Sequence, residues 1–138
     1  MKKNKNFTTN QHELRTEGST RNEDICFIQS DLFNNISGKF YIIVSNPPYV
    51  PTKEIETLAP ELRREPRLAL DGGEDGLDLI RKIISGAQDH LLPKGVLLIE
   101  AGPEQMPPIR ILLENHHFSG IRVYKDLAGR DRVVAAHF

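Results

Sequence analysis

The sequence has 138 residues, of which 38% are hydrophobic and 27% are charged, and its formal net charge is -1. Such a chain can bury the core of one globular domain, and its near-neutral charge gives no sign of an obligate nucleic-acid partner. The single cysteine, Cys26, excludes an internal disulfide and a cysteine-based metal site. Its apolar neighbours Ile25 and Phe27 predict that Cys26 is a buried hydrophobic residue.

No hydrophobic run in the sequence is long enough for a membrane-spanning helix. The lysines near the N-terminus precede no apolar stretch of the kind that a secretory signal contains. We therefore expect a reduced, cytoplasmic protein without a membrane partner. Carboxylates gather at Asp71, Glu74 and Asp75, but their spacing is not that of an EF-hand calcium loop, so no metal site is predicted.

The chain divides into two parts by composition. Residues 1–24 are polar and aperiodic, which is typical of a flexible tail. The folded part is expected over residues 25–138, and it starts with a short buried strand at 25–28. Residues 40–44 form a continuous run of apolar and β-branched side chains, which predicts a central strand covered on both faces.

Helices and strands alternate over the rest of the chain. Apolar residues recur at helical spacing from Leu77 to Leu91, and another continuous apolar run predicts the next strand. The last two strands are separated by a short connection, which favours an antiparallel hairpin. This order predicts an α/β protein with a mostly parallel sheet. The expected elements are a short helix at 53–58, a helix at 77–91, a strand at 96–99, a helix at 104–116 and a hairpin of 121–124 with 132–136.

The strongest candidate for a functional site is the segment Asn46-Pro47-Pro48-Tyr49, which follows the predicted strand at 40–44 directly. Pro47 and Pro48 have no backbone N–H, so the chain must leave the sheet there. Ligands of α/β sheets bind at the carboxyl ends of the strands, where Asn46 is expected to lie. A simpler interpretation is a strand-ending turn in which the aromatic ring fills a gap.

These residue types suit the binding of a planar amide or amino group. The nitrogen of such a group shares its lone pair with a π system, and the lone pair must become localised before the nitrogen can accept a methyl group. Hydrogen-bond acceptors for both N–H hydrogens favour that change, and the side-chain oxygen of Asn46 and the main-chain carbonyl of Pro47 are candidates. Tyr49 offers a flat face for the planar group. Positioning would supply most of the rate without a strong base, so Asn46, Pro47 and Tyr49 are the candidate catalytic residues.

Four segments of the sequence resemble the peptide-chain release factor glutamine methyltransferases of the HemK type. They are Phe27 to Phe33, Ile43 to Tyr49, Glu65 to Leu77 and Asp126 to Arg132. The Asn-Pro-Pro-Tyr segment alone is shared with DNA adenine and RNA guanine methyltransferases, whereas its combination with Glu65 to Leu77 is much more specific. The resemblance covers about residues 25–138 and corresponds to the C-terminal part of such enzymes.

The resemblance implies a class I, Rossmann-like fold, the cofactor S-adenosyl-L-methionine and a peptide-chain release factor as the protein substrate. The substrate glutamine would be bound by Asn46, Pro47, Pro48 and Tyr49. The cofactor would lie beside Asn46, and its adenine would be bordered by Asp31 and Leu32. The segment from Glu65 to Leu77 would lie near the mouth of the substrate site. For Asp31, the cap of a turn or helix is an equally good interpretation.

The sequence also departs from the family pattern. It contains no GxGxG segment, which would let the backbone approach the cofactor, and no clear acidic residue for the ribose hydroxyls. We therefore expect a truncated sheet that lacks the first two strands. The strand at 40–44 would then present an exposed edge, through which the chain could associate with itself. Besides the enzyme, two alternatives remain: a non-catalytic or degenerate fragment that keeps the amide pocket, and a nucleic-acid amino-methyltransferase.

Overall fold

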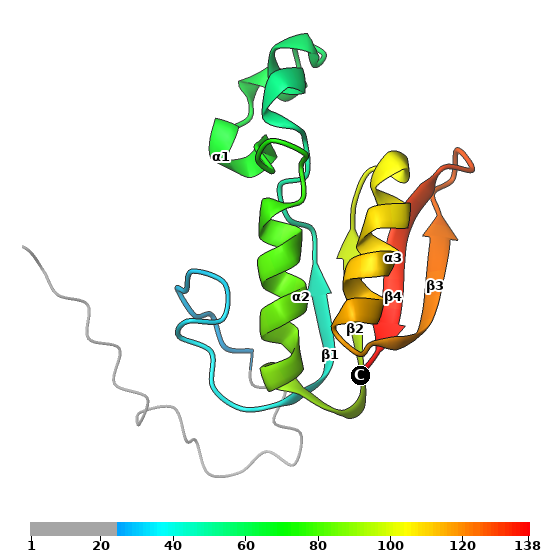
Figure 1. Ribbon diagram of the computed structural model, residues 1–138. Helices are drawn as coiled ribbons and strands as arrows, with labels where there is room; N and C mark the ends of the chain where they lie inside the picture. The colour runs from blue at the N-terminus through cyan, green and yellow to red at the C-terminus, as the bar shows by residue number, and fades with distance from the viewer. Residues whose placement is uncertain (1–24) are drawn as a thin grey trace, which may run out of the picture.

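The computed structural model describes residues 25–138, and the predicted tail at 1–24 lies outside this range. The core of the fold is a four-stranded sheet with the strand order β1-β2-β4-β3. Its strands are β1 (Phe40–Ser45), β2 (Leu91–Glu100), β3 (Ser119–Lys125) and β4 (Asp131–His137). β1 pairs with β2 in parallel, whereas β4 is antiparallel to both of its neighbours (Figure 1). The predicted α/β class and the C-terminal hairpin are therefore confirmed.

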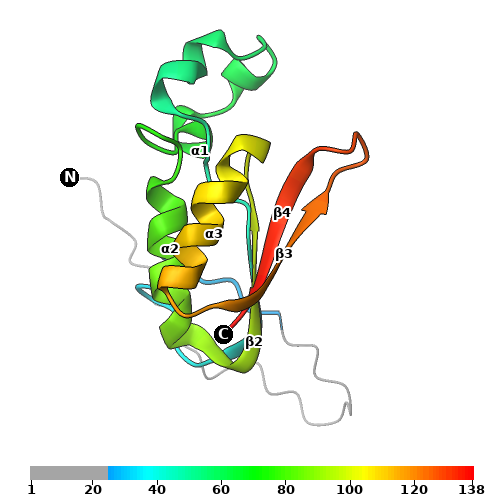
Figure 2. The ribbon, with the colours of Figure 1, turned by 45° about the vertical axis from the view of Figure 1, so that its right-hand side comes forward.

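Two helices cover one face of this sheet, as the turned view shows (Figure 2). They are α2 (Asp78–His90) and α3 (Met106–Asn115). Each is amphipathic and turns its apolar side to the strands, which is where most of the hydrophobic stabilisation arises. The largest fully buried side chains come from both helices and from β2 and β4, and they are Ile80, Ile84, Leu91, Leu97, Ile99, Ile109, Leu113 and Val134. Neither these helices nor any other in residues 25–138 is long and apolar enough to cross a membrane.

Short helical turns build a separate layer above the carboxyl end of β1 (Figure 1). The proline-rich sequence between residues 51 and 66 breaks up longer helices, because proline interrupts the backbone hydrogen bonds. The predicted helix at 53–58 is therefore a 3-10 turn, η1 (Thr52–Thr57). It is followed by η2 (Leu62–Arg64) and the four-residue α1 (Arg67–Leu70), and a third turn, η3 (Pro103–Gln105), precedes α3.

The predicted strand at 25–28 is wrong. Residues 25–30 have no strand structure, and the side chain of Phe27 is 94% exposed. Cys26 is exposed as well, contrary to the prediction that it is buried. An apolar run forms a strand only if a neighbouring strand accepts its hydrogen bonds, and none of the described strands pairs with it.

The prediction that residues 40–44 are covered on both faces is also wrong. β1 is one of the two edge strands of the described sheet, and among residues 25–138 no strand pairs with its free edge. Ile43 packs against the core, but Val44 is 73% exposed and Ile42 is 61% exposed on the face opposite the helices. The apolar run therefore has the composition of a strand that is buried on both faces, but the described residues cover only one of its faces.

Candidate functional site

The Asn-Pro-Pro-Tyr turn, residues 46–49, leaves the sheet at the carboxyl end of β1, as predicted from its prolines. Asn46 is exposed, Pro47 is buried, and Pro48 and Tyr49 are half-buried. All four line a hollow of about 240 Å³. The remaining wall of this hollow comes from the layer of short turns, namely Val50, Leu58, Leu62, Glu65, Ala69 and Leu70. The structure thus gathers the four predicted substrate-binding residues around one small, mainly apolar hollow with an exposed amide at its edge.

The hollow is small compared with most ligand pockets. Pockets for drug-sized ligands typically measure roughly 300–1,000 Å³, and this one falls below that range at about 240 Å³. Leu58 and Leu62 provide apolar walls, and Glu65 places a carboxylate among them. A side chain that reaches in from a protein substrate matches these dimensions better than a free nucleotide does.

Polar contacts from two other parts of the fold hold the ring of Tyr49 in place. Its hydroxyl donates to Glu100 Oε1 at 3.4 Å and accepts from Arg132 Nη1 at 3.2 Å. Arg132 in turn contacts Asp126 Oδ2 at 3.4 Å. The carboxyl end of β2 and the β3–β4 hairpin therefore hold the ring through its hydroxyl, while the main chain of the turn continues from β1.

Burial raises the pKa of the Tyr49 hydroxyl above its ordinary value. The positive charge of Arg132 acts in the opposite direction, and the negative charge of Glu100 adds to the increase. The hydroxyl therefore keeps its proton at neutral pH and acts as a hydrogen-bond donor to Glu100. It serves to hold the ring in place and is not a base for the chemistry.

The segment from Glu65 to Leu77 wraps around the main chain of the turn. Val50 donates to the carbonyl of Leu70 at 3.0 Å, and Gly72 donates to the carbonyl of Val50 at 2.9 Å. A Cβ atom on Gly72 would lie 2.8 Å from Tyr49 Cα, so this close approach requires a glycine. Gly72 of this segment thus packs closely against the main chain of the turn, and Glu65 is one of the residues that line the hollow.

Asp71 secures the same segment from its other side. It accepts from Thr52 Oγ1 at 2.6 Å and from the Gly73 amide at 3.1 Å. The bond from Thr52 is the main reason that the pKa of Asp71 lies below its ordinary value. Asp71 and its neighbours therefore act as loop-building residues here.

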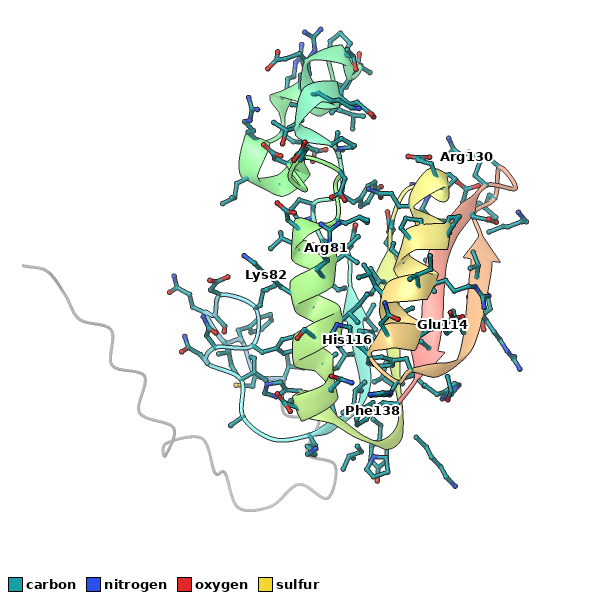
Figure 3. The ribbon with its side chains drawn as sticks, in the orientation of Figure 1. Arg81, Lys82, Glu114, His116, Arg130 and Phe138 are labelled. Carbon is teal, nitrogen blue, oxygen red and sulfur yellow. The ribbon has the colours of Figure 1, made fainter. Side chains whose placement is uncertain are left out.

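Asp31 and Leu32 do not lie with Asn46. They line a separate, open hollow of about 620 Å³ beside α2, together with Arg81, Lys82 and His116 (Figure 3). Phe33 anchors their loop by stacking on His90 at a centroid distance of 4.8 Å. The three residues predicted to contact the cofactor are thus divided between two hollows. The physical reason is the missing strand at 25–28, which would have carried Asp31 to the carboxyl edge of the sheet.

No role in the site was predicted from the sequence for three residues that the structure links to Tyr49. Asp126 and Arg132 lie in a segment that resembles the family, but only the fold reveals their link to Tyr49. Gln105 bonds to the Tyr49 carbonyl at 2.9 Å from a position 56 residues further along the chain. The only local sign of a role for Gln105 in the sequence is its position three residues after Gly102, at the start of a predicted helix.

Two of the solved structures that are similar to this chain illustrate its fold. The ribosomal protein L11 methylase from Lactobacillus delbrueckii subsp. bulgaricus superposes with a TM-score of 0.50 at 21% identity, over 82% of this chain and 44% of that one. The E. cuniculi Mtq2–Trm112 complex, responsible for the methylation of the eRF1 translation termination factor, gives a TM-score of 0.52 at 20% identity, over 80% and 59%. At such identities the likeness concerns the fold alone. The sheet and the two helices on its face have the α/β fold of these two structures, over the part of each that this chain covers.

The sequence comparisons identify the family. The release factor glutamine methyltransferase of Deinococcus radiodurans is 42% identical over 113 residues, and that of Thermodesulfovibrio yellowstonii is 43% identical over 114 residues. The matches cover 82% and 81% of this chain but 40% and 41% of those relatives. No family model matches the chain. The chain belongs to the family of release factor glutamine methyltransferases and spans about two fifths of the length of these relatives.

Proposed function

We propose that this chain supplies the acceptor-binding part of an enzyme that transfers a methyl group from S-adenosyl-L-methionine to a glutamine side-chain nitrogen. The acceptor glutamine belongs to a peptide-chain release factor, the substrate named for the relatives. The observation that carries the proposal is the hollow at residues 46–49. There an exposed asparagine amide, rigid prolines and a fixed aromatic ring surround a space sized for one side chain.

The chemistry assigned to the hollow concerns the acceptor amide. The side-chain oxygen of Asn46 and the carbonyl of Pro47 accept the two N–H hydrogens of the glutamine amide, which favours a localised lone pair on its nitrogen. The ring of Tyr49 supports the planar amide. Because the two prolines restrict the backbone, the acceptors are held in place before the substrate arrives.

We infer that the described residues do not by themselves form a cofactor site. Asp31 and Leu32 lie in a different hollow from Asn46, and the 138 residues contain no GxGxG segment. We therefore propose that the donor site is completed by a polypeptide part corresponding to the portion of the relatives that this chain does not match. Until that part is present, the chain can hold and orient the acceptor amide only.

A second interpretation is a non-catalytic module that binds an amide side chain. The separation of Asp31 and Leu32 from Asn46 favours it for the chain in isolation. The third alternative, a nucleic-acid amino-methyltransferase, has less support, because the relatives are named for a protein substrate. Since release factors act in translation, we propose the cytoplasm as the place of action.

Complementation tests the proposed function. The chain is mixed with the part of the Deinococcus radiodurans relative that it does not match, together with methyl-labelled S-adenosylmethionine and a release factor. We expect label on one glutamine of the release factor. As a control, the same relative part is mixed with its own remaining part. If that control is active and the mixture with this chain transfers no label, the proposal is wrong.

A further inference from the structure

A buried amide side chain joins the Asn-Pro-Pro-Tyr turn to two other segments. Gln105 lies in η3, just after the carboxyl end of β2, and is 5% exposed. It is the buried polar residue of the described core, whose other members are apolar. A polar side chain that is buried this far must satisfy its hydrogen-bonding groups within the protein, so its partners show what it connects.

Both ends of the Gln105 amide are used. Its Oε1 accepts from the Gly102 amide at 3.0 Å, and its Nε2 donates to the main-chain carbonyls of Tyr49 at 2.9 Å and Asp75 at 3.3 Å. The side chain therefore links the loop after β2, the end of the turn and the loop before α2. The pattern requires two N–H donors and one acceptor on one planar group, which a primary amide provides and a carboxylate does not.

The neighbouring loop is shaped to permit these contacts. Gly76 adopts a positive φ of 77°, and a Cβ atom at this position would overlap both the Tyr49 carbonyl and Gln105 Nε2. Glycine is the residue that tolerates this conformation and leaves this space free. The contact between Gln105 and Tyr49 therefore depends both on the Gln105 amide and on the absence of a side chain at Gly76.

We propose that Gln105 is a positioning residue for the acceptor site, an inference that rests on the proposed function. Pro47 and Pro48 restrict two of the φ angles between β1 and Tyr49, so the turn moves nearly as one unit. The Gln105 bond fixes the far end of this unit at the Tyr49 carbonyl. It thereby sets the direction of the Pro47 carbonyl and the Asn46 side chain, although it contacts neither.

The first test follows the turn itself by NMR on this chain. Gln105→Met removes the amide at similar size, and Gln88→Met is the matched control, because Gln88 donates to the main-chain carbonyl of His116 away from the turn. In Gln105→Met we expect the Gly102 amide to exchange about tenfold faster, since it loses its acceptor. The resonances of Asn46 and Tyr49 should shift, while amides of the β2–β4 ladder keep their rates. Unshifted Asn46 and Tyr49 resonances would overturn the inference.

The second test uses the complementation assay. Gln105→Met should lower kcat about tenfold or more and change the KM for the release factor little, because misplaced acceptors impair the transfer more than they impair docking. Gln88→Met should retain activity. Equal kcat values for wild type and Gln105→Met would overturn the inference, provided that wild type is active.

A third variant separates positioning from a loss of folding. In Gln105→Glu a carboxylate faces the two carbonyl oxygens of Tyr49 and Asp75, whereas the protonated acid can donate to one of them. Activity should therefore be low at neutral pH and recover in part as the pH falls, with far-UV circular dichroism unchanged. A pH profile parallel to that of wild type would contradict positioning. If the complemented wild type transfers no methyl group, the proposed function fails, and the NMR shifts alone decide whether Gln105 holds the turn.

Discussion

Replacement of Tyr49 separates the role of its ring from that of its hydroxyl. Tyr49→Phe removes one bond donated to Glu100 and one accepted from Arg132, at 3.4 and 3.2 Å. A hydrogen bond to a charged group is worth roughly 1.5–3 kcal/mol at good geometry, but both of these bonds are long and only partly buried, so we expect a combined loss of about 1 kcal/mol in the free energy of unfolding. Arg132 keeps its contact with Asp126, which limits the cost. Tyr49→Ala also removes the half-buried ring and should cost about 2–3 kcal/mol.

Equilibrium urea unfolding, followed by far-UV circular dichroism, measures both losses. Tyr41→Phe serves as the control, because Tyr41 is 75% exposed on the edge strand β1, and the urea midpoint of this variant should equal that of wild type. In the complementation assay Tyr49→Phe should retain more activity than Tyr49→Ala, since the ring face is the proposed contact with the amide. If Tyr49→Phe is as stable as Tyr41→Phe, the hydroxyl bonds do not hold the ring. If Tyr49→Phe is as inactive as Tyr49→Ala, the ring face is not the contact.

Three further predictions concern the acceptor, the hairpin and the open edge. Asn46→Ala should lower turnover in the complementation assay by about 100-fold, whereas the control Asn115→Ala, at an exposed position, should not lower it. If Asn46→Ala turns over as fast as wild type, Asn46 is only a turn residue. The pKa of Asp126 is lowered, mainly because its carboxylate accepts a hydrogen bond from the Arg130 amide. The ionised carboxylate therefore stabilises the folded state above its ordinary pKa of 3.8, and this contribution is lost as the pH falls through the lower pKa of the folded state. The difference in urea midpoint between wild type and Asp126→Asn should therefore shrink below pH 4, and a constant difference would contradict this. We also propose that the chain associates with itself through β1, so its sedimentation should depend on concentration in wild type and less so in Val44→Lys; a wild type that is monomeric at every concentration contradicts this.

The sequence predicted those elements whose pattern depends on neighbours close along the chain. The apolar spacing between Leu77 and Leu91 identified α2 within a residue at each end, because a helix closes its own hydrogen bonds. The continuous apolar runs identified β1 and β2, and the short connection identified the hairpin. For β2 the predicted range was too short, since Leu91 to Gly95 continue the strand through Pro93.

The sequence failed where the outcome depends on partners distant in the chain. Residues 25–28 have the composition of a strand, but the described sheet offers them no neighbour, so Cys26 is exposed as well. Asp31 lies apart from Asn46 for the same reason, and its role beside the cofactor stays a prediction. Gln105 could not be assigned, because its partners Tyr49 and Asp75 lie 56 and 30 residues away. By contrast, the gathering of residues 46–49 around one hollow followed from their order in the chain.

Calorimetric titration with S-adenosylmethionine tests the central claim most directly, namely that this chain carries the acceptor half of the site and not the cofactor half. The cofactor contacts that we propose to come from the complementary part include at least two hydrogen bonds that involve a charged group. At about 1.5–3 kcal/mol each, their loss predicts that the chain alone binds roughly 10²–10⁴-fold more weakly than the complemented enzyme. Addition of the complementary part of the relative should restore binding, and that part alone should not reach the same affinity. A dissociation constant of about 1 μM or lower for the chain alone would contradict the claim.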